Sequence, residues 1–238
     1  MRYLLVFMLL VGLFVVGKNS FHFGIGIRGT GPVKTESRNV SDFHAIELNV
    51  AAEVEVKISD NYFVEVEAQE NLLPVLKTEV ENGTLKIYFD ENVSYSKDLR
   101  IRVSAPAFDA FAVAGSGTLR ALAPIRSEKM DLSVAGSGEI FVPEGDFGTL
   151  KASISGSGGI ELGGKADSMT SEISGSGDVK AKAFTANDLQ ASIAGSGSVT
   201  CDVARTLKAD IAGSGDVFYS GSPAVNADVS GSGKVTKL

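Results

Sequence analysis

Residues 134–140 read Val134-Ala135-Gly136-Ser137-Gly138-Glu139-Ile140, and the Gly-Ser-Gly triplet at their centre decides the fold. The triplet occurs seven times in the second half of the chain, with steps of 21, 20, 19, 20, 18 and 18 residues. Such self-similarity at a nearly constant period is typical of repeat architectures. The triplets begin at Gly115, Gly136, Gly156, Gly175, Gly195, Gly213 and Gly231.

Aligning the seven copies on the triplet reveals columns of aliphatic residues on both sides of it. Two residues before each triplet the chain has valine or isoleucine, and two residues after it leucine, isoleucine or valine. These positions share one parity, and side chains of a strand alternate between two faces with a period of two. We therefore place both aliphatic columns on an inner face, together with the glycines Gly115, Gly117, Gly136, Gly138, Gly156, Gly158, Gly175, Gly177, Gly195, Gly197, Gly213, Gly215, Gly231 and Gly233.

A period of 18–21 residues is too short for a β-α-β unit, which takes about 30 residues. No window shows a convincing apolar stripe at helical spacing. The repeats therefore predict an all-β fold, a right-handed parallel β-helix or β-solenoid with one coil per repeat. Each coil would bury its apolar columns against the coils above and below it.

Residues 39–105 differ in pattern from the repeats: apolar and polar residues alternate, but the Gly-Ser-Gly triplet is absent. Val50 to Val56 align with Val134 to Ile140 if Ala52 and Val54 take the two glycine positions. The dipeptide Asn82-Gly83 within residues 80–87 indicates a hairpin. We interpret residues 39–105 as degenerate N-terminal coils that cap the repeats of 106–238, within a single domain over 39–238.

The N-terminus has the features of a targeting segment. Arg2 precedes an apolar run from Leu4 to Val16, which suits a secretory signal and is short for a membrane span. Residues 1–17 are therefore predicted to be a signal peptide or an uncleaved anchor, and residues 18–38, rich in glycine and polar residues, a flexible linker. The protein is expected to be exported, to the periplasm, the cell surface or the medium.

The order of several motifs resembles the bacterial family called "putative auto-transporter adhesin, head GIN domain". The resemblance covers roughly residues 38–238 and implies an exported cell-envelope protein with a β-helix-like fold and an adhesive role. It brings no catalytic or binding residues with it. The motifs that carry it are Arg38-Asn39-Val40-Ser41-Asp42-Phe43-His44-Ala45-Ile46, Asn71-Leu72-Leu73, Asn82-Gly83-Thr84-Leu85-Lys86-Ile87 and the recurring Gly-Ser-Gly.

The composition and motifs argue against several classes of binding and catalytic function. The formal net charge of −7 disfavours binding to nucleic acid or to an anionic membrane surface. The lone cysteine, Cys201, falls at inner parity and reads as a core side chain, and no residues have metal-ligand spacing or indicate a cofactor. The middle serines form either a glycan-facing hydroxyl column or small outward residues at a bend. The candidate ligand-facing residues are Ser137, Ser157, Ser176, Ser196, Ser214, Asp178 and Asp216.

Two functions remain in competition. The first is a non-enzymatic structural or binding module of the cell envelope, an adhesin that presents repetitive polar faces to a glycan or a protein. The second is a carbohydrate-active β-helix enzyme acting on an acidic polysaccharide, with Asp178 and Asp216 in one column, two coils and about 10 Å apart. Because the last triplet is followed by only five residues, we also expect self-association through open solenoid edges, or protection of the edge by another part of the chain.

Overall fold

The computed structural model describes residues 26–95 and 99–238, and these residues form strands, turns and bends without any helix. Within these two ranges, therefore, no helix is long and apolar enough to cross a membrane. The predicted signal segment, residues 1–17, and residues 18–25 lie outside the described residues.

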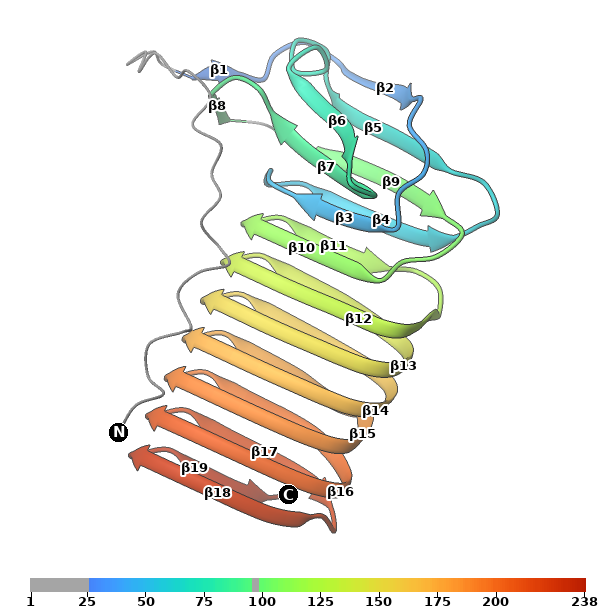
Figure 1. The fold of residues 1–238 in the computed structure, drawn as a ribbon. Helices are drawn as coiled ribbons and strands as arrows, with labels where there is room; N and C mark the ends of the chain where they lie inside the picture. The colour runs from blue at the N-terminus through green and yellow to red at the C-terminus, as the bar shows by residue number, and fades with distance from the viewer. Residues whose placement is uncertain (1–25, 96–98) are drawn as a thin grey trace.

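From residue 110 onward the chain winds into stacked coils (Figure 1). Each coil runs toward a Gly-Ser-Gly corner, turns there, runs back and then bends into the next coil. The strands of this part pair in parallel with the coil before and, except in the last coil, with the coil after. The strands are β10 (Ala110–Gly115), β11 (Thr118–Ala121), β12 (Ile125–Gly136), β13 (Glu139–Gly156), β14 (Gly159–Gly175), β15 (Asp178–Gly195), β16 (Ser198–Gly213), β17 (Asp216–Gly221), β18 (Ala224–Gly231) and β19 (Lys234–Lys237).

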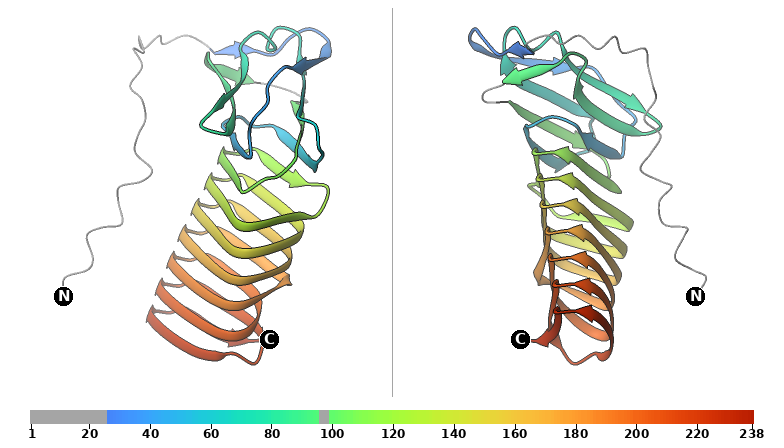
Figure 2. Two further views of the ribbon diagram at one scale, coloured as in Figure 1. Left: turned by 45° about the vertical axis from the view of Figure 1, so that its right-hand side comes forward. Right: turned by 90° about the vertical axis from the view of Figure 1, so that its left-hand side faces the viewer.

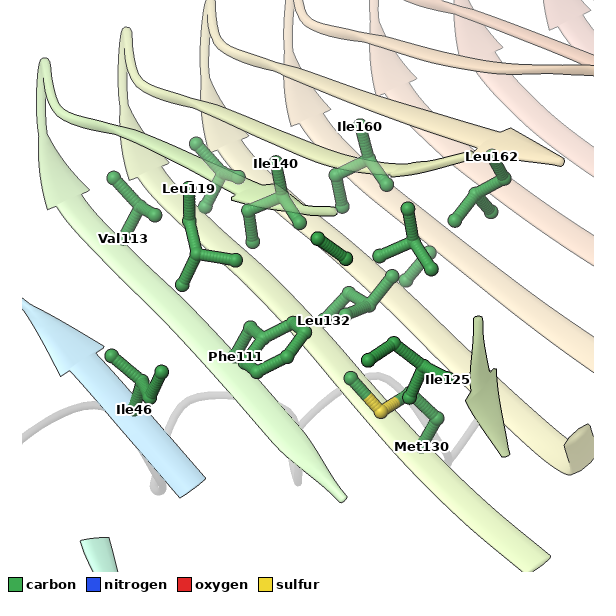
Figure 3. Close-up of a cluster of buried hydrophobic side chains, with 14 of the residues drawn as sticks. Ile46, Phe111, Val113, Leu119, Ile125, Met130, Leu132, Ile140, Ile160 and Leu162 are labelled. Carbon is green, nitrogen blue, oxygen red and sulfur yellow. The ribbon is translucent and has the colours of Figure 1, made fainter. Parts of the chain in front are cut away.

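The register of the pairing confirms the predicted columns. Ile154 lies beside Ile173, Ile193 and Ile211 in successive coils, and triplet lies beside triplet. The aliphatic side chains of both columns fill the space between the two sides of each coil, as Figure 3 shows for Val113, Leu119 and Ile140. Burying each such side chain contributes about 1.5–3 kcal/mol, so the stacked columns supply the core of the solenoid.

Each coil has three parts of different regularity. The approach arm leads into the triplet, the return arm leaves it, and the bend joins the return arm to the next approach arm. Both arms keep one register through the stack, so the varying repeat length falls in the bends. The first four bends have five to seven residues and the last two have four; they comprise residues 122–128, 143–148, 163–167, 182–187, 202–205 and 220–223.

The two glycines of a triplet have different roles, which corrects the assignment of both to the inner face. The second glycine is buried in all but the last coil, as predicted. The first glycine lies half-exposed at the corner with a positive φ, for example +127° at Gly156. Alternation of faces holds only for extended backbone, and a residue with positive φ interrupts it.

The corners stack so closely that side chains would not fit between them. A Cβ atom on Gly156 would lie 2.4 Å from the carbonyl oxygen of Gly136, and one on Gly158 would lie 2.4 Å from that of Gly138. The backbone N–H of Ser157 donates a hydrogen bond of 2.8 Å to the same Gly136 oxygen. The corner is therefore a column of backbone hydrogen bonds between neighbouring coils.

The N-terminal part continues both sides of the solenoid and then closes it (Figures 1 and 2). One side continues from β10 to β3 and β7, the other from β11 to β4 and β9, all in parallel. Antiparallel strands complete the cap: β6 on β7, β5 on β9 and β2 on β5. The bounds are β1 (Ile27–Arg28), β2 (Val33–Arg38), β3 (Ala45–Leu48), β4 (Glu53–Ile58), β5 (Phe63–Gln69), β6 (Leu76–Glu81), β7 (Thr84–Phe89), β8 (Val93–Tyr95), which pairs with β1, and β9 (Arg100–Ala105).

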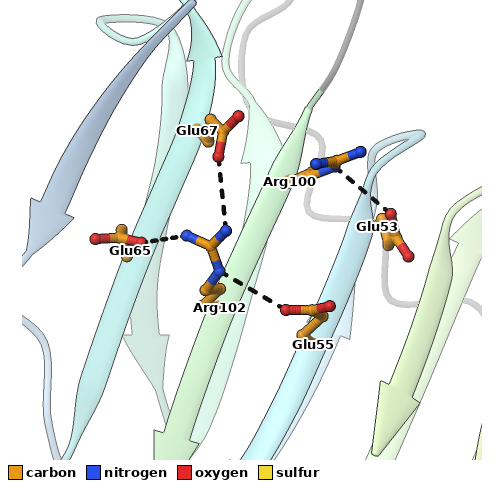
Figure 4. Close-up of polar contacts among 6 residues, drawn as sticks. All are labelled: Glu53, Glu55, Glu65, Glu67, Arg100 and Arg102. Carbon is orange, nitrogen blue, oxygen red and sulfur yellow. Dashed lines mark hydrogen bonds and ion pairs between the residues drawn. The ribbon is translucent and has the colours of Figure 1, made fainter. Parts of the chain in front are cut away.

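Ion pairs cover the outer face where parallel pairing changes to antiparallel pairing (Figure 4). Arg102 of β9 lies between Glu55 of β4 and Glu65 of β5, with Nη1 2.6 Å from the Glu65 carboxylate and Nε 3.7 Å from that of Glu55. Arg100 likewise faces Glu53 at 3.7 Å. Exposed pairs of this kind contribute at most about 1 kcal/mol each, so they set strand order more than stability.

Two expectations for this part are corrected. The degenerate first coil exists, but Val50 and Ala52 occupy the glycine positions, because Leu48 pairs with Val113 and Val54 pairs with Leu119. The expected alignment was two residues out of register, and a shift of two leaves the alternation unchanged. The flexible linker over 18–38 is wrong for residues 33–38, which form β2 and pair with β5.

The corner geometry predicts unequal costs for equivalent glycine substitutions. Gly115→Ala places a Cβ in open space at a positive φ, so it should cost only the backbone strain of about 1–3 kcal/mol. Gly136→Ala carries the same strain and also sets a Cβ 2.6 Å from the Gly115 carbonyl oxygen, so it should cost clearly more. Urea unfolding monitored by circular dichroism measures both, and equal losses would contradict the close stacking of the corners.

Candidate binding surface

The predicted serine column exists and follows one edge of the solenoid. Ser137, Ser157, Ser176, Ser196 and Ser214 are all exposed at successive corners. Their backbone N–H groups are bonded to the preceding coil, whereas their hydroxyls have no hydrogen-bond partner among the described residues. The column is thus a line of free hydroxyls about 4.8 Å apart on a convex edge.

The two aspartates predicted to face a ligand instead join neighbouring coils. The Asp178 carboxylate accepts hydrogen bonds from the backbone N–H of Ser198 at 3.0 Å and from its hydroxyl at 2.6 Å. Asp216 accepts the backbone N–H of Lys234 at 2.9 Å. Both carboxylates therefore satisfy polar groups of the next coil along the return arms.

A groove lies on the opposite edge from the serines, where the bends are long. The groove, of about 1010 Å³, is lined by residues of four successive bends, 122–128, 143–148, 163–167 and 182–187. Beneath it Phe147 and Phe184 fill the interior of the bends, with ring centroids 6.3 Å apart. The groove thus has a fixed apolar floor below a polar surface.

Some charged side chains of the groove are paired, and others have no partner among the described residues. Lys165 is engaged by Asp146 at 3.5 Å, and Asp167 accepts a hydrogen bond of 3.2 Å from Asn187. The side chains of Arg126, Glu128 and Glu144 have no hydrogen bond or ion pair to any described residue. One free guanidinium and two free carboxylates therefore lie on neighbouring bends and face solvent.

Beyond the groove, Arg205 of the four-residue bend 202–205 pairs with Asp188 of the preceding coil. The Asp188 carboxylate accepts hydrogen bonds from Arg205 Nε at 3.0 Å and from the Thr206 hydroxyl at 2.6 Å. These bonds hold the pKa of Asp188 at about 2, below its usual value. Arg205 therefore has a partner in the preceding coil, whereas Arg126 of the groove has none among the described residues.

Sequence reasoning missed the groove because it aligned the copies on the triplet. The bend residues are those that fall outside every aligned column. The signal was present in the uneven spacing of the triplets and in Pro124, the Pro143-Glu144-Gly145 stretch and Gly163-Gly164, which interrupt the alternation. Segments whose length varies within a rigid repeat are where binding residues are commonly placed.

A reactive thiol and a metal site are the other kinds of site to consider. Cys201 is buried in the core, where its thiol contacts the backbone oxygens of Phe184 and Asp202. Burial raises the pKa of Cys201 to about 12. Within residues 26–95 and 99–238 there is no group of three or more His, Cys, Asp or Glu side chains arranged to hold a metal ion.

Comparison with known proteins shows likenesses over nearly the whole described chain. The family model "Putative auto-transporter adhesin, head GIN domain" matches residues 42–223. No curated protein sequence matches the chain.

Three solved bacterial structures show the fold. A putative adhesin of Bacteroides fragilis aligns with a TM-score of 0.84 and 21% identity, over 90% of this chain and 100% of that one. A putative adhesin of Parabacteroides merdae has a TM-score of 0.74 and 22% identity, over 89% and 98% of the two chains. A structure from Parabacteroides distasonis described as a putative lipid binding protein has a TM-score of 0.76 and 28% identity, over 89% and 99%.

The environment of Cys201 predicts a thiol that is inert in the folded protein. With a pKa of about 12, only about one thiol in ten thousand is ionised at pH 8, and the thiolate is the reactive form. Iodoacetamide at pH 8 should leave Cys201 unmodified in the native protein and alkylate it in urea. A Ser176→Cys variant supplies an exposed control thiol. Native alkylation of Cys201 at the rate of this control would contradict the buried assignment.

Proposed function

The chain belongs to the family described as "Putative auto-transporter adhesin, head GIN domain", and from this we propose that it is an exported, non-catalytic binding module of the cell envelope. Its ligand is a neutral or amino-sugar glycan, held in the groove formed by bends 122–128 to 182–187. The observation that carries the proposal is the set of unpartnered charged side chains, Arg126, Glu128 and Glu144, on adjacent bends of a rigid coil stack.

Rigidity supports binding by this surface. The arms on both sides of each bend are locked by parallel pairing and by buried side chains. The bends are therefore held in place before a ligand arrives. A preorganised surface avoids much of the ordering cost that binding otherwise carries.

The chemistry of the groove favours sugar hydroxyls. Carboxylates such as Glu128 and Glu144 accept hydrogen bonds from hydroxyls, and the Arg126 guanidinium donates several in a fixed plane. The charged lining comprises two cations, Arg126 and Lys165, and four acids, Glu128, Glu144, Asp146 and Asp167. This excess of negative charge disfavours a polyanionic ligand and suits a neutral or amino sugar.

The polar lining also bears on the lipid-binding description given to the Parabacteroides distasonis structure. A lipid tail requires an apolar cavity, because its binding depends on removing apolar surface from water. The groove of this chain is lined largely by charged and polar residues, while its apolar side chains, such as Ile125 and Phe147, are buried beneath. A polar ligand therefore fits this surface better than a lipid tail.

The alternative, a carbohydrate-active enzyme, has less support. The two carboxylates that it requires, Asp178 and Asp216, each accept a backbone N–H from the next coil. They lie on the return arms and are not among the residues that line the groove. Their hydrogen bonds suit a structural role, in which the carboxylates are oriented toward the next coil.

Export remains part of the proposal and rests on the N-terminal sequence. Arg2 and the apolar run from Leu4 to Val16 have the composition of a secretory signal. The family name, which refers to adhesins, agrees with a location outside the cytoplasm. The compartment is the periplasm, the cell surface or the medium.

Groove variants test the proposal. A glycan array should show the purified protein binding neutral or amino-sugar glycans in preference to polyuronates. Arg126→Ala and Glu144→Gln should each weaken that binding about tenfold or more, as expected for loss of a hydrogen bond to a charged group. Glu161→Gln, an exposed glutamate on a return arm, is the matched control and should bind normally. Titration calorimetry measures the affinities.

Two results would contradict the proposal. One is binding that survives both groove substitutions but is lost when serines of the corner column are replaced. The other is release of reducing sugar from a polysaccharide by the wild-type protein, abolished by Asp178→Asn or Asp216→Asn, which would establish the enzymatic alternative.

A further inference from the structure

The last coil of the solenoid has a paired side and an unpaired side. Strand β18 pairs with β16 and strand β19 with β17, and no other described strand pairs with either. Val225 and Val229 are 43% and 37% exposed, whereas Leu207 and Ile211, their neighbours in the preceding coil, are 1% and 3% exposed. The inner aliphatic columns therefore continue into a coil whose outer edge is open (Figure 1).

The opposite end of the solenoid is protected against strand pairing. There the edge strands β2 and β6 carry charges at alternate positions: Lys34, Glu36 and Arg38 on β2, and Lys77, Glu79 and Glu81 on β6. Charged residues on an edge strand discourage pairing with another chain. Strand β18 carries a single charge, Asp228, and exposes valines, so it lacks the alternating charges that protect the opposite end.

We propose that the last coil pairs with the last coil of a second copy of this chain. The two copies are related by a two-fold axis parallel to the strands, so that β18 pairs antiparallel with the partner's β19, and β19 with the partner's β18. Both sides of the solenoid then continue across the junction. Val229 lies opposite the partner's Val235, and the aliphatic columns of the two copies meet.

Charge complementarity selects this arrangement. Strand β19 carries Lys234 and Lys237 without any acid, while β18 carries Asp228 alone. In the proposed register Asp228 lies diagonally across from the partner's Lys234, a distance at which side chains of paired strands interact. A two-fold axis perpendicular to the sheets would instead set β19 against β19 and the lysines of one copy against those of the other. Like charges facing each other across paired strands are destabilising.

The symmetry makes the assembly closed. A two-fold interface uses the same surface on both copies, so it gives a dimer and leaves no edge for a third copy. The two capped ends, which carry β2 and β6, point away from the junction. The groove of each copy stays accessible, since it lies on the long bends near the cap.

Sedimentation equilibrium on the full chain tests the dimer. The wild-type protein should have twice the monomer mass at micromolar concentration. Val229→Lys should shift it to monomer, because the substitution places a charge in the joined aliphatic columns. Glu161→Lys, an exposed substitution in mid-solenoid, should leave the mass unchanged. Circular dichroism melting of each variant shows that loss of mass is not loss of folding.

Charge reversal tests the pairing of β18 with the partner's β19. Asp228→Lys and Lys234→Asp alone should each weaken the dimer about tenfold or more, and the double variant should recover most of the loss. In an assembly that pairs β18 with β18 and β19 with β19, the double variant would still set like charges together. Absence of recovery would therefore overturn the proposed orientation.

A single new thiol tests the position of the axis. The register that sets Val229 opposite the partner's Val235 places Ser232 next to the partner's Ser232, at the joined corners. Ser232→Cys should form a covalent dimer on mild oxidation, and Ser214→Cys, one coil inward in the same column, should not. The native thiol does not interfere because Cys201 is buried.

Three outcomes overturn the inference. They are a wild-type protein that is monomeric at high micromolar concentration, a dimer that persists in Val229→Lys, and a dimer whose Ser232→Cys variant fails to cross-link. If the full chain is monomeric but the chain without residues 1–25 dimerises, the N-terminal segment and not a second copy covers the edge, which also overturns the inference.

Discussion

The structure depends on the distance between successive Gly-Ser-Gly corners. From the second corner onward the backbone of one coil lies so close to that of the coil before it that no Cβ atom fits, and the serine N–H donates a hydrogen bond to the glycine carbonyl of that preceding coil. Because each of these corners repeats the contact, both arms of the stacked coils have one register. The aliphatic columns, the straight serine edge and the positions of the bends all follow from that register.

Much of the fold could be predicted because the triplet marks the same structural position seven times. Alternation around it assigns residues such as Ile154 and Ile160 to the core, and the structure confirms both. Alternation alone could not set the register of the first coil, since a shift by two residues keeps every face. It also could not show that the first glycine turns the chain, because the parity rule assumes extended backbone. Residues 33–38 lack an apolar pattern, and they form β2 only because β5 offers an edge.

The candidate site was less predictable, for a physical reason. Core side chains of stacked coils must match one another in size and position, so the arms and corners have similar sequences in every copy. Alignment of the copies therefore detects them. A binding surface needs groups that differ from coil to coil, and these sit in the bends, which the stacking leaves free in length. Arg126, Glu128 and Glu144 therefore lie where the copies cannot be aligned. The repeated aspartates, which align well, turned out to bond the neighbouring coil.

The central claim is that corners and arms make the rod while the long bends make the binding surface. Replacing bends 122–128 and 143–148 by the four-residue bend of 202–205 tests it most directly, with melting temperature and glycan affinity measured on the same protein. The account predicts a folded solenoid that binds no glycan and melts at a somewhat lower temperature, because the buried side chains of Ile125 and Phe147 are lost. An unchanged affinity, or a chain that no longer folds, would contradict it.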